Sequence, residues 1–302
     1  MYTVKFFLQH PLMIGDYLLN HSPRLWPDRL YVKMRFYFNY GYRLNLDDPK
    51  GFNEKCQWLK LNYRRPEFTE MVDKYTAKAW AAKRIGQEHI VPTYGVWNSF
   101  DEIDFDRLPQ SFILKCTHDS GGNVVCRDKS KLDKDAARRK LTAALAKNTF
   151  LHTREWPYKN VKPRIIAEEL LKENSGDGVI SDYKFFCFDG EPRVMYVSKD
   201  GAADPRTDFF DMEWNHLPVR MRDLNADVQP EKPAQFEEMR QMARTLSAGL
   251  PHVRADFYLV NGHIYFGEMT LYTCAGMPTF NPWEWNRTFG DWITLPEKFN
   301  PA

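Results

Sequence analysis

Residues 254–270 read Arg-Ala-Asp-Phe-Tyr-Leu-Val-Asn-Gly-His-Ile-Tyr-Phe-Gly-Glu-Met-Thr. The pair Asn261-Gly262 lies between two runs of alternating apolar residues, and this arrangement is the strongest short-range signal of a β-hairpin. Each predicted strand carries one acid, Asp256 before the turn and Glu268 after it. The segment therefore predicts two antiparallel strands with a carboxylate on each.

The length of the turn decides whether the two acids point to the same side of the hairpin. A two-residue loop, Asn261-Gly262, would place Asp256 and Glu268 on opposite faces, because strand side chains alternate with period two. A three-residue loop that begins at Val260 and ends in a left-handed glycine would place both acids on one face. We expect the three-residue loop, which gathers on one face Arg254, Asp256, Glu268 and Thr270.

Two carboxylates beside an arginine are what a Mg²⁺–phosphate site needs. Hard carboxylate oxygens bind the metal, and a planar guanidinium binds phosphate. The alternative interpretation of the same segment is an ordinary hairpin with two solvated acids.

Composition limits the classes of protein to which the chain can belong. It has 302 residues, 43% hydrophobic and 15% aromatic, enough for a large core in one or two domains. The net charge of +2 gives no reason to expect a nucleic-acid partner. Five scattered cysteines without C-x-x-C spacing predict neither zinc nor a disulfide framework and favour the cytoplasm. We expect neither a signal peptide nor a transmembrane helix.

Helical and extended patterns alternate along the chain. Helices are predicted at 52–63, 69–85, 131–148 and 234–250, and strands at 92–97, 112–116, 124–126, 165–167, 182–188 and 193–198. Such a mixture, with several hairpins, predicts an α+β architecture. Residues 20–46 mix basic and aromatic side chains. They fit a segment on a membrane surface or polyanion, or a packed aromatic helix with cations at its edge, and we favour the helix.

Three further segments carry side chains that suit phosphate or nucleotide chemistry. Lys115 ends a strand before the small-residue turn Gly121-Gly122, whose backbone could approach phosphate, although an ordinary hairpin turn is the simpler interpretation. Glu168-Glu169 follow a strand and suit an amino group, or else a helix N-terminal turn. Asp182 and Lys184 share a strand face, where the alternative is an exposed ion pair.

The order of these elements resembles the ATP-grasp superfamily, and several motifs resemble its TupA-like branch over roughly residues 50 to 285. The branch is associated with teichuronopeptide and other cell-surface polysaccharide synthesis. The matching motifs are Phe52-Asn-Glu-Lys-Cys-Gln-Trp-Leu-Lys60, Asp73-Lys-Tyr75, Val91-Pro-Thr-Tyr-Gly-Val96, Phe112-Ile-Leu-Lys115, Ser181-Asp-Tyr-Lys-Phe-Phe-Cys-Phe188 and Tyr265-Phe-Gly-Glu-Met-Thr270.

The resemblance implies a fold in which ATP is held between two α+β subdomains. It divides the chain into a helical N-terminal region, 1–95, a lid subdomain, 96–166, and a C-terminal subdomain, 167–302, with the Mg²⁺-binding hairpin. The implied cofactors are ATP and Mg²⁺.

The resemblance also implies roles for individual residues. The ATP-binding set is Lys115 before the lid, the lid glycines Gly121 and Gly122, Glu168 and Glu169 at the adenine amine, the Leu171 backbone at the adenine ring, Asp182 at the ribose, and Lys184 at the phosphates. The metal set is Asp256, Glu268 and Thr270, with Arg254 beside the transferred phosphoryl group. Thr270 departs from the family, which usually has asparagine there.

The implied reaction is ATP-dependent ligation of a carboxylate to an amine through an acyl phosphate. In a polysaccharide pathway the acid could belong to a uronic acid and the amine to an amino acid. The partners would then include a lipid-linked glycan, with the enzyme cytoplasmic or peripheral at the inner membrane face. Lys184, Arg254 and Lys199 are the predicted catalytic cations, and Arg206 and His216 are further candidates for substrate contact. The alternatives are a glycosyltransferase and a non-catalytic ATP-binding scaffold.

Overall fold

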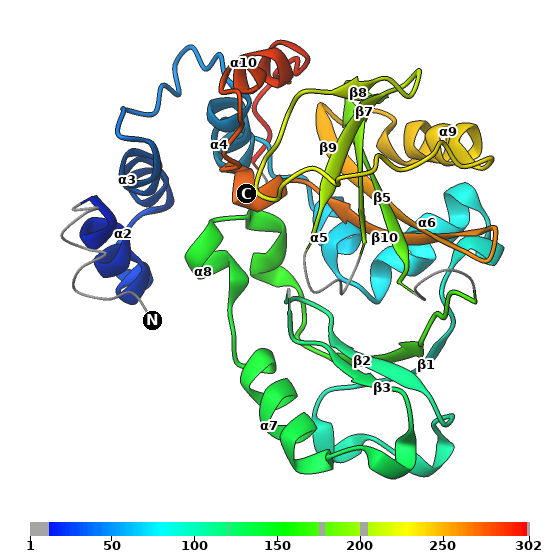
Figure 1. The fold of residues 1–302 in the computed structure, drawn as a ribbon. Coiled ribbons are helices and arrows are strands. Elements are labelled where there is room, and N and C mark those ends of the chain that lie inside the picture. Colours follow the sequence, from blue (N-terminus) through cyan, green and yellow to red (C-terminus); the bar gives the residue numbers. More distant parts are fainter. Residues whose placement is uncertain (1–11, 120, 175–178, 200–204, 301–302) are drawn as a thin grey trace.

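The computed structural model describes residues 12–119, 121–174, 179–199 and 205–300, and two antiparallel sheets dominate it (Figure 1). The small sheet has the strand order β1-β4-β2-β3, and the large sheet has the order β10-β9-β5-β6-β7-β8. The strands of the small sheet are β1 (Thr93–Trp97), β2 (Phe112–Cys116), β3 (Val124–Cys126) and β4 (Ile165–Glu169). Those of the large sheet are β5 (Ser181–Phe188), β6 (Glu191–Lys199), β7 (Thr207–Asp211), β8 (His216–Leu217), β9 (His252–Val260) and β10 (His263–Thr270).

Helices accompany both sheets, so the predicted α+β class is confirmed. The α-helices are α2 (Leu12–His21), α3 (Asp28–Tyr40), α4 (Phe52–Asn62), α5 (Glu67–Val72), α6 (Thr76–Ile85), α7 (Lys134–Leu145), α8 (Thr149–Thr153), α9 (Phe236–Ser247) and α10 (Glu284–Asp291). In Figure 1, α7 lies beside the small sheet, and α6 and α9 lie beside the large one. No described helix is both long and apolar enough to cross a lipid bilayer.

The larger of two hydrophobic cores lies around the large sheet. The predicted stripe of α9 is buried there, since Phe236, Met239 and Leu246 are each at most 2% exposed. Residues of α4, α5 and α6 belong to the same core, so these helices are part of the body that carries the large sheet. The smaller core joins α7 to the small sheet.

Several predicted element boundaries differ from the observed ones, and two of these differences concern segments next to the site. The helix predicted at 69–85 is divided into α5 and α6, because Asp73 leaves the helical conformation and its carboxylate binds Arg164 at 2.6 Å. The strand predicted to end at residue 167 continues to Glu169. The predicted lid boundary between residues 166 and 167 therefore falls inside β4, a strand of the small sheet.

His252 begins β9 inside an aromatic cage and is 2% exposed. Its ring lies 4.9 Å from the rings of Phe52 and Phe188, measured between centroids. Nδ1 lies 2.9 Å from the carbonyl oxygen of Cys187. Burial lowers the pKa of His252 to about 3, because a charged imidazole in this cage would lack water.

This burial predicts a loss of stability in mild acid. The unfolded chain takes up the imidazole proton below its ordinary pKa near 6.5, and the native state does not. The free energy of unfolding should therefore fall by about 2 kcal/mol between pH 7 and pH 5 through this residue. Urea unfolding of wild type and His252→Phe at both pH values measures the difference. An equal pH dependence in the two proteins would contradict the assignment, and His21→Gln, at an exposed histidine, serves as control.

Candidate functional site

In Figure 1 the large sheet lies above the small one, and residues of both sheets line a polar cavity of about 230 Å³. Both sheets contribute to its walls, with Lys115 and Glu168 from the small sheet and strands β5, β9 and β10 from the large one. The charged lining residues are Lys74, Lys78, Lys115, Lys184, Glu168, Asp182, Asp256 and Glu268. Four cations and four carboxylates therefore surround one space that is open to solvent.

The hairpin that decides the fold closes through a two-residue loop, so the predicted three-residue loop was wrong. Val260 pairs directly with His263. Asn261 and Gly262 both take positive φ angles, 50° and 80°, as a tight hairpin turn of the mirror-image type requires. Asparagine tolerates the left-handed region, so the pair can supply both turn residues without Val260.

The two acids nevertheless share a face, because a β-bulge at Gly267 shifts the register. Phe266 pairs with Phe257, but Glu268 pairs with Asp256, so Gly267 is the extra residue of β10. A Cβ atom at position 267 would lie 3.0 Å from the carbonyl oxygen of Asp256, which favours glycine at the bulge. The predicted grouping of the four hairpin side chains is therefore correct, for a different structural reason.

Asp256 is the most strongly paired carboxylate of the site and is 1% exposed. Arg254 binds it with two nitrogens, Nε at 2.7 Å from Oδ1 and Nη2 at 2.6 Å from Oδ2. Lys184 of the neighbouring strand donates to Oδ2 at 3.1 Å. Burial raises the pKa of Asp256, but the two cations outweigh burial and hold it below its ordinary value. The interpretation as ordinary solvated acids is wrong for Asp256.

Asp182 is a second buried acid on the same face of the sheet. Its Oδ2 pairs with Lys184, so the predicted neighbours do form an ion pair, but Asp182 is buried and the pair lies on an interior strand. Burial raises the pKa of Asp182 to about 7, and Lys184 only partly opposes this. Its Oδ1 atom is buried and has no hydrogen-bond partner among the described residues. This oxygen can accept a bond from a ligand in the cavity.

Glu268 and Thr270 form the outer part of the same face. The Thr270 hydroxyl donates to Glu268 Oε1 at 3.0 Å and accepts from Arg254 Nη2 at 3.1 Å. The Glu268 side chain is 45% exposed, so its carboxylate is accessible from the cavity.

The small sheet contributes one carboxylate bound by two lysines. Glu168 Oε2 lies 2.8 Å from Lys115 Nζ, and Oε1 lies 2.6 Å from Lys78 Nζ. Burial disfavours the Glu168 carboxylate, but Lys115 and Lys78 outweigh burial and hold its pKa below the ordinary value. The carboxylate thus holds the ends of two lysines at the cavity wall.

Sequence reasoning missed two cavity lysines, Lys74 and Lys78, which α6 and the turn before it bring to the site. Lys74 Nζ donates to the Asp119 carbonyl oxygen at 2.8 Å, which joins this turn to the segment before the lid glycines. The motif Asp73-Lys-Tyr75 contains Lys74, but the motif alone gives this lysine no role. Lys78 lies in an alanine-rich helix and gave no comparable signal.

Some predicted site residues lie away from the cavity. Gly121, with φ 91°, lines it, whereas Gly122 lies under α7, where a Cβ would meet that of Ala144 at 2.8 Å. Glu169 and Leu171 are not among its lining residues. The side chain of Lys199 lies outside the described part. Arg206 donates to the Asn225 carbonyl, and His216 pairs with Asp208 at 3.0 Å.

The residues present fit a hard divalent cation without forming an all-carboxylate cluster. Within the described ranges no three His, Cys, Asp or Glu side chains are grouped closely enough to hold a metal by themselves. Asp256, Glu268 and the Thr270 hydroxyl nevertheless place hard oxygens on one face, and the unpartnered Asp182 oxygen lies on the same face. Such a partial set suits Mg²⁺, which usually keeps water and substrate phosphates among its ligands.

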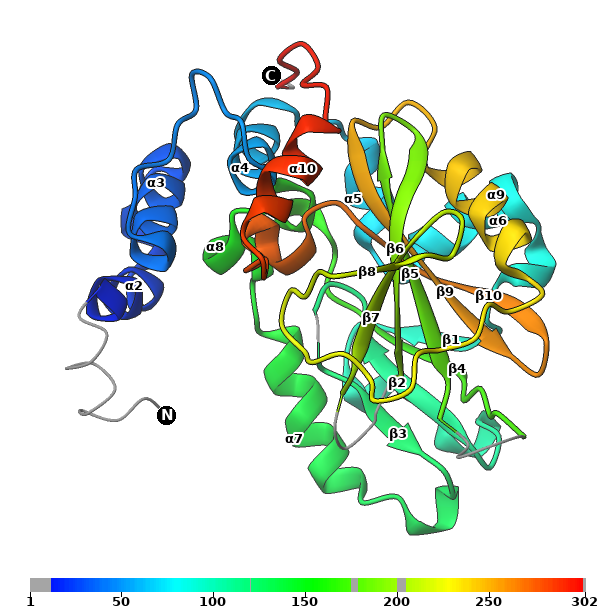
Figure 2. The same cartoon turned by 45° about the horizontal axis from the view of Figure 1, so that its top comes forward.

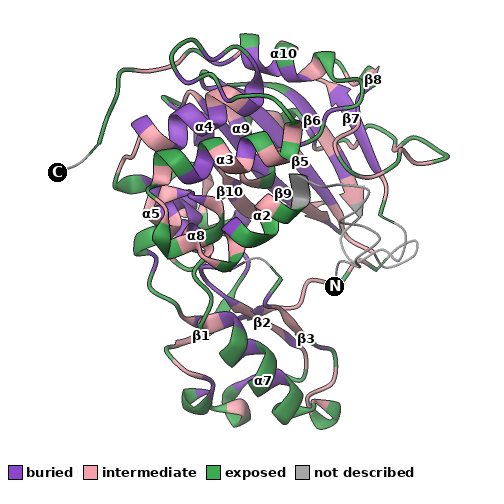
Figure 3. Cartoon of the chain, turned by 90° about the vertical axis from the view of Figure 1, so that its left-hand side faces the viewer, coloured by how far each residue is buried: buried purple, intermediate pink, exposed green. Residues whose placement is uncertain are grey.

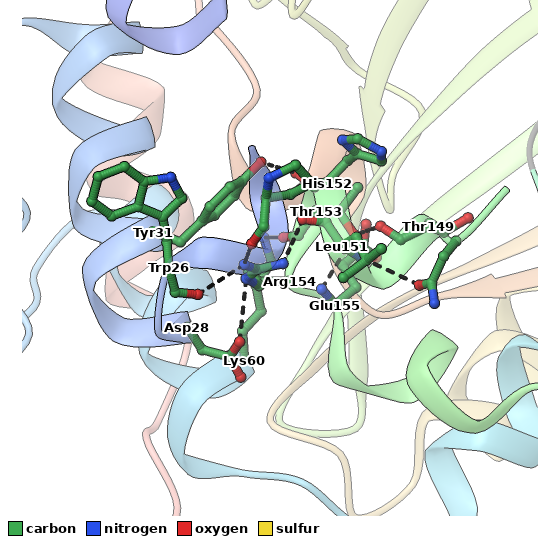
Figure 4. A network of polar contacts seen from close by, with 12 residues as sticks. Trp26, Asp28, Tyr31, Lys60, Thr149, Leu151, His152, Thr153, Arg154 and Glu155 are labelled. Atoms are coloured by element: carbon green, nitrogen blue, oxygen red, sulfur yellow. Dashed lines mark hydrogen bonds and ion pairs between the residues drawn. The ribbon is translucent and has the colours of Figure 1, made fainter. Parts of the chain in front are cut away.

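A buried lysine holds the segment that follows the hairpin. Cys274, Ala275 and Gly276 all have positive φ angles, a conformation that costs energy for the first two residues and needs support from the surrounding structure. Lys60, which is fully buried, donates to the carbonyl oxygens of Ala275 and of Thr153, the latter at 2.9 Å (Figure 4). Gln57 donates to the Gly276 carbonyl at 2.8 Å. Helix α4 therefore fixes the chain beside the site.

Comparison with known proteins gives one family match. The family model described as TupA-like ATPgrasp matches residues 54–294. None of the curated proteins matches the chain in sequence.

Solved structures with similar folds are distant in sequence. D-alanine–D-alanine ligase from Bacillus anthracis, complexed with ATP, has 13% identity and a TM-score of 0.39, with 74% of this chain and 57% of that chain covered. The ATP-grasp ligase PsnB, complexed with a minimal precursor, has 11% identity and a TM-score of 0.40, with coverage of 72% and 59%. D-alanine–D-alanine ligase from Helicobacter pylori has 15% identity and a TM-score of 0.41, with coverage of 82% and 70%. The chain thus spans less than two thirds of the first two.

Removal of the Lys60 ammonium should destabilise the protein. In Lys60→Met, three acceptors (the buried Gln57 Oε1 and the half-buried Thr153 and Ala275 carbonyls) lose their donor. The relief of a buried charge offsets part of this loss, so we expect a decrease of about 2 kcal/mol in unfolding free energy. The urea midpoint measures it. Lys131→Met, at a side chain 82% exposed, is the control and should leave the midpoint unchanged. Equal midpoints for both variants would contradict the expectation.

Proposed function

The chain belongs to the TupA-like ATP-grasp family, so its fold and enzyme class are those of ATP-dependent ligases, and on this premise we propose that it joins a carboxylate to an amine in cell-surface polysaccharide synthesis. The observation that carries this proposal is the cavity between the two sheets. Three of its four lysines come from the small sheet, α6 and the turn before α6, and three of its four acids come from the large sheet, a division that suits a triphosphate bound together with a divalent cation.

The nucleotide would lie along the cavity between the sheets. Lys74, Lys78 and Lys115 would bind phosphate oxygens, as would the backbone at Gly121, which has no side chain to block a phosphate. Asp182 would accept a hydrogen bond from the ribose through its unpartnered oxygen. The adenine would lie near β4 and the segment that follows it, where the family resemblance assigns Glu168, Glu169 and Leu171.

Asp256, Glu268 and Thr270 would hold Mg²⁺, which would offset the charge of the phosphates. Both Asp256 oxygens are bound by protein cations, so Lys184 and Arg254 would shift or share them when the metal binds. The two cations would then be next to the phosphoryl group, where they can neutralise developing charge. Arg254 suits this role because Asp256, two residues further along the same strand, orients its guanidinium.

The chemistry would proceed in two displacements. A substrate carboxylate oxygen attacks the γ-phosphorus, the bond to the β-phosphate oxygen breaks, and ADP leaves. An amine then attacks the carbonyl carbon of the acyl phosphate, an amide forms, and inorganic phosphate leaves with the proton passing to water or base. We assign the acid to a uronic acid residue, the amine to an amino acid, and the acceptor to a lipid-linked glycan at the cytoplasmic membrane face. Lys199 remains the candidate catalytic cation on the substrate side.

Metal-ligand variants test the proposal. ADP release would be followed with Mg²⁺, ATP, uronic acids and a panel of amino acids. Glu268→Gln should lower turnover roughly 100-fold, because it removes an anionic ligand from a site that stabilises transferring charge. Glu268 is half-exposed, so this variant should keep its fold, whereas Asp256→Asn disrupts a buried ion pair and needs a parallel unfolding measurement.

Glu237→Gln, at a surface acid paired with Lys232, is the matched control and should turn over normally. Unchanged turnover in Glu268→Gln would refute the assignment of the site. ATP binding without turnover over the whole panel would favour the scaffold, and a preference for a nucleotide sugar over ATP would favour a glycosyltransferase.

Thr270 gives a gain-of-function test. An amide oxygen is a better Mg²⁺ ligand than a neutral hydroxyl, so Thr270→Asn should tighten Mg²⁺ binding in the presence of a non-hydrolysable ATP analogue, by roughly fivefold. Thr270→Val removes the hydroxyl at similar volume and should weaken it. Calorimetric titration measures both. Equal affinities in Thr270→Asn, Thr270→Val and wild type would exclude residue 270 from the metal site.

A further inference from the structure

Helices α2 and α3 form an N-terminal arm, residues 12–42, that stands beside the body of the protein (Figures 1 and 2). Large apolar side chains are exposed on it far more often than elsewhere. Seven of the fourteen exposed large apolar residues in the described part belong to it: Ile14, Tyr17, Leu18, Leu25, Leu30, Tyr37 and Tyr42. In Figure 3 the arm faces the viewer, and exposed residues run along both helices.

The inner side of the arm is attached to the body of the protein. The apolar residues on its outer side are therefore exposed although the arm itself is packed. Arg154, which is 2% exposed, donates to the carbonyls of Pro23 and Trp26 and pairs with Asp28 at 3.2 Å (Figure 4). Its guanidinium lies 4.0 Å from the ring centroid of Tyr31, which is itself buried. The outward surface is therefore held in place by the body.

The outward apolar residues follow helical spacing. Ile14, Tyr17 and Leu18 occupy positions i, i+3 and i+4 of α2, which lie on one face of a helix. Leu30 and Tyr37 are two turns apart on α3. Leu25, in the connection, is 76% exposed. An apolar face directed away from the core is typical of helices that lie in a membrane interface.

Charges on the arm are divided between its two sides. The acids are directed inward, since Asp16 pairs with Arg35 at 3.7 Å and Asp28 with Arg154. The exposed side carries Arg24, Arg29 and Lys33. No carboxylate in the described ranges lies within ion-pair distance of Arg24 or Lys33, and the Arg29 pair is an exposed contact of 3.8 Å. The outward surface is therefore apolar and cationic.

We propose that the outward surface of the N-terminal arm docks on an anionic lipid bilayer. Apolar side chains would enter the interface while the cations meet lipid phosphates. A second copy of the chain fits less well, because a symmetric contact through this surface would bring like charges together. Such docking would hold the protein at the membrane face proposed above, but it does not require the ligase activity.

Vesicle co-sedimentation tests the inference with the full chain. Vesicles of phosphatidylcholine with one quarter phosphatidylglycerol should bind the protein at least tenfold more tightly than pure phosphatidylcholine, and 0.5 M NaCl should weaken binding. Two variants address the surface: Leu18→Ser with Leu25→Gln, and Arg24→Glu with Lys33→Glu. Each should lose binding at least tenfold. Val228→Gln and Lys131→Glu, at side chains exposed elsewhere, are the matched controls and should bind normally.

Several results would overturn the proposal. These are absent binding, equal binding to both vesicles, arm variants that bind like wild type, or a dimer in solution that the arm variants abolish. Thermal unfolding shows whether the variants are folded. ADP release with a soluble acceptor should be the same in arm variants and wild type, so a failure of docking and a failure of the ligase proposal give different results.

Discussion

The ion pairs around Asp256 are the interaction on which the site depends. A carboxylate that is 1% exposed would be strongly disfavoured in the middle of a sheet without compensation. Arg254 and Lys184 supply that compensation, one from the same strand and one from the neighbouring strand. Both must lie on the same face as Asp256, so the strand register cannot slip by one residue without leaving buried charges unpaired. The buried charges thus help to specify the sheet that carries them.

The cavity brings together residues that two separate hydrophobic cores hold in place. Lys115 and Glu168 are held by the small sheet, whereas Asp256 and Glu268 are held by the large one. Helix α6 belongs to the core of the large sheet, yet its Lys78 reaches Glu168 across the cavity. The ion pair of Lys78 with Glu168 therefore joins the two halves of the cavity wall. The charged groups of the cavity thus neutralise one another through ion pairs within the protein.

The segment between the two halves also connects to the N-terminal arm. Arg154 holds the arm, while the neighbouring Thr153 carbonyl accepts from Lys60, which supports the left-handed turn beside the hairpin (Figure 4). Burial of Lys60 lowers its pKa to about 8, and burial raises that of the nearby Glu155 to about 7. Consecutive residues of one connection thus hold the arm and, through Lys60, the turn that follows the hairpin.

The sequence by itself determined the hairpin, the stripe of α9, the order of the elements and, through its motifs, the family. These signals are local, since turn residues, alternation and helical spacing act between near neighbours in the chain. Only the tertiary structure decided how Asp256 and Glu268 come to share a face and which lysines join them. The loop is two residues long, and a bulge at Gly267, which packs against the Asp256 backbone, shifts the register so that the two acids share a face. Lys78 meets Glu168 across 90 residues of chain. Neither the bulge nor this ion pair has a local sequence signal. The bulge depends on the backbone of the neighbouring strand, and the ion pair depends on which charged side chains meet once the sheets have packed.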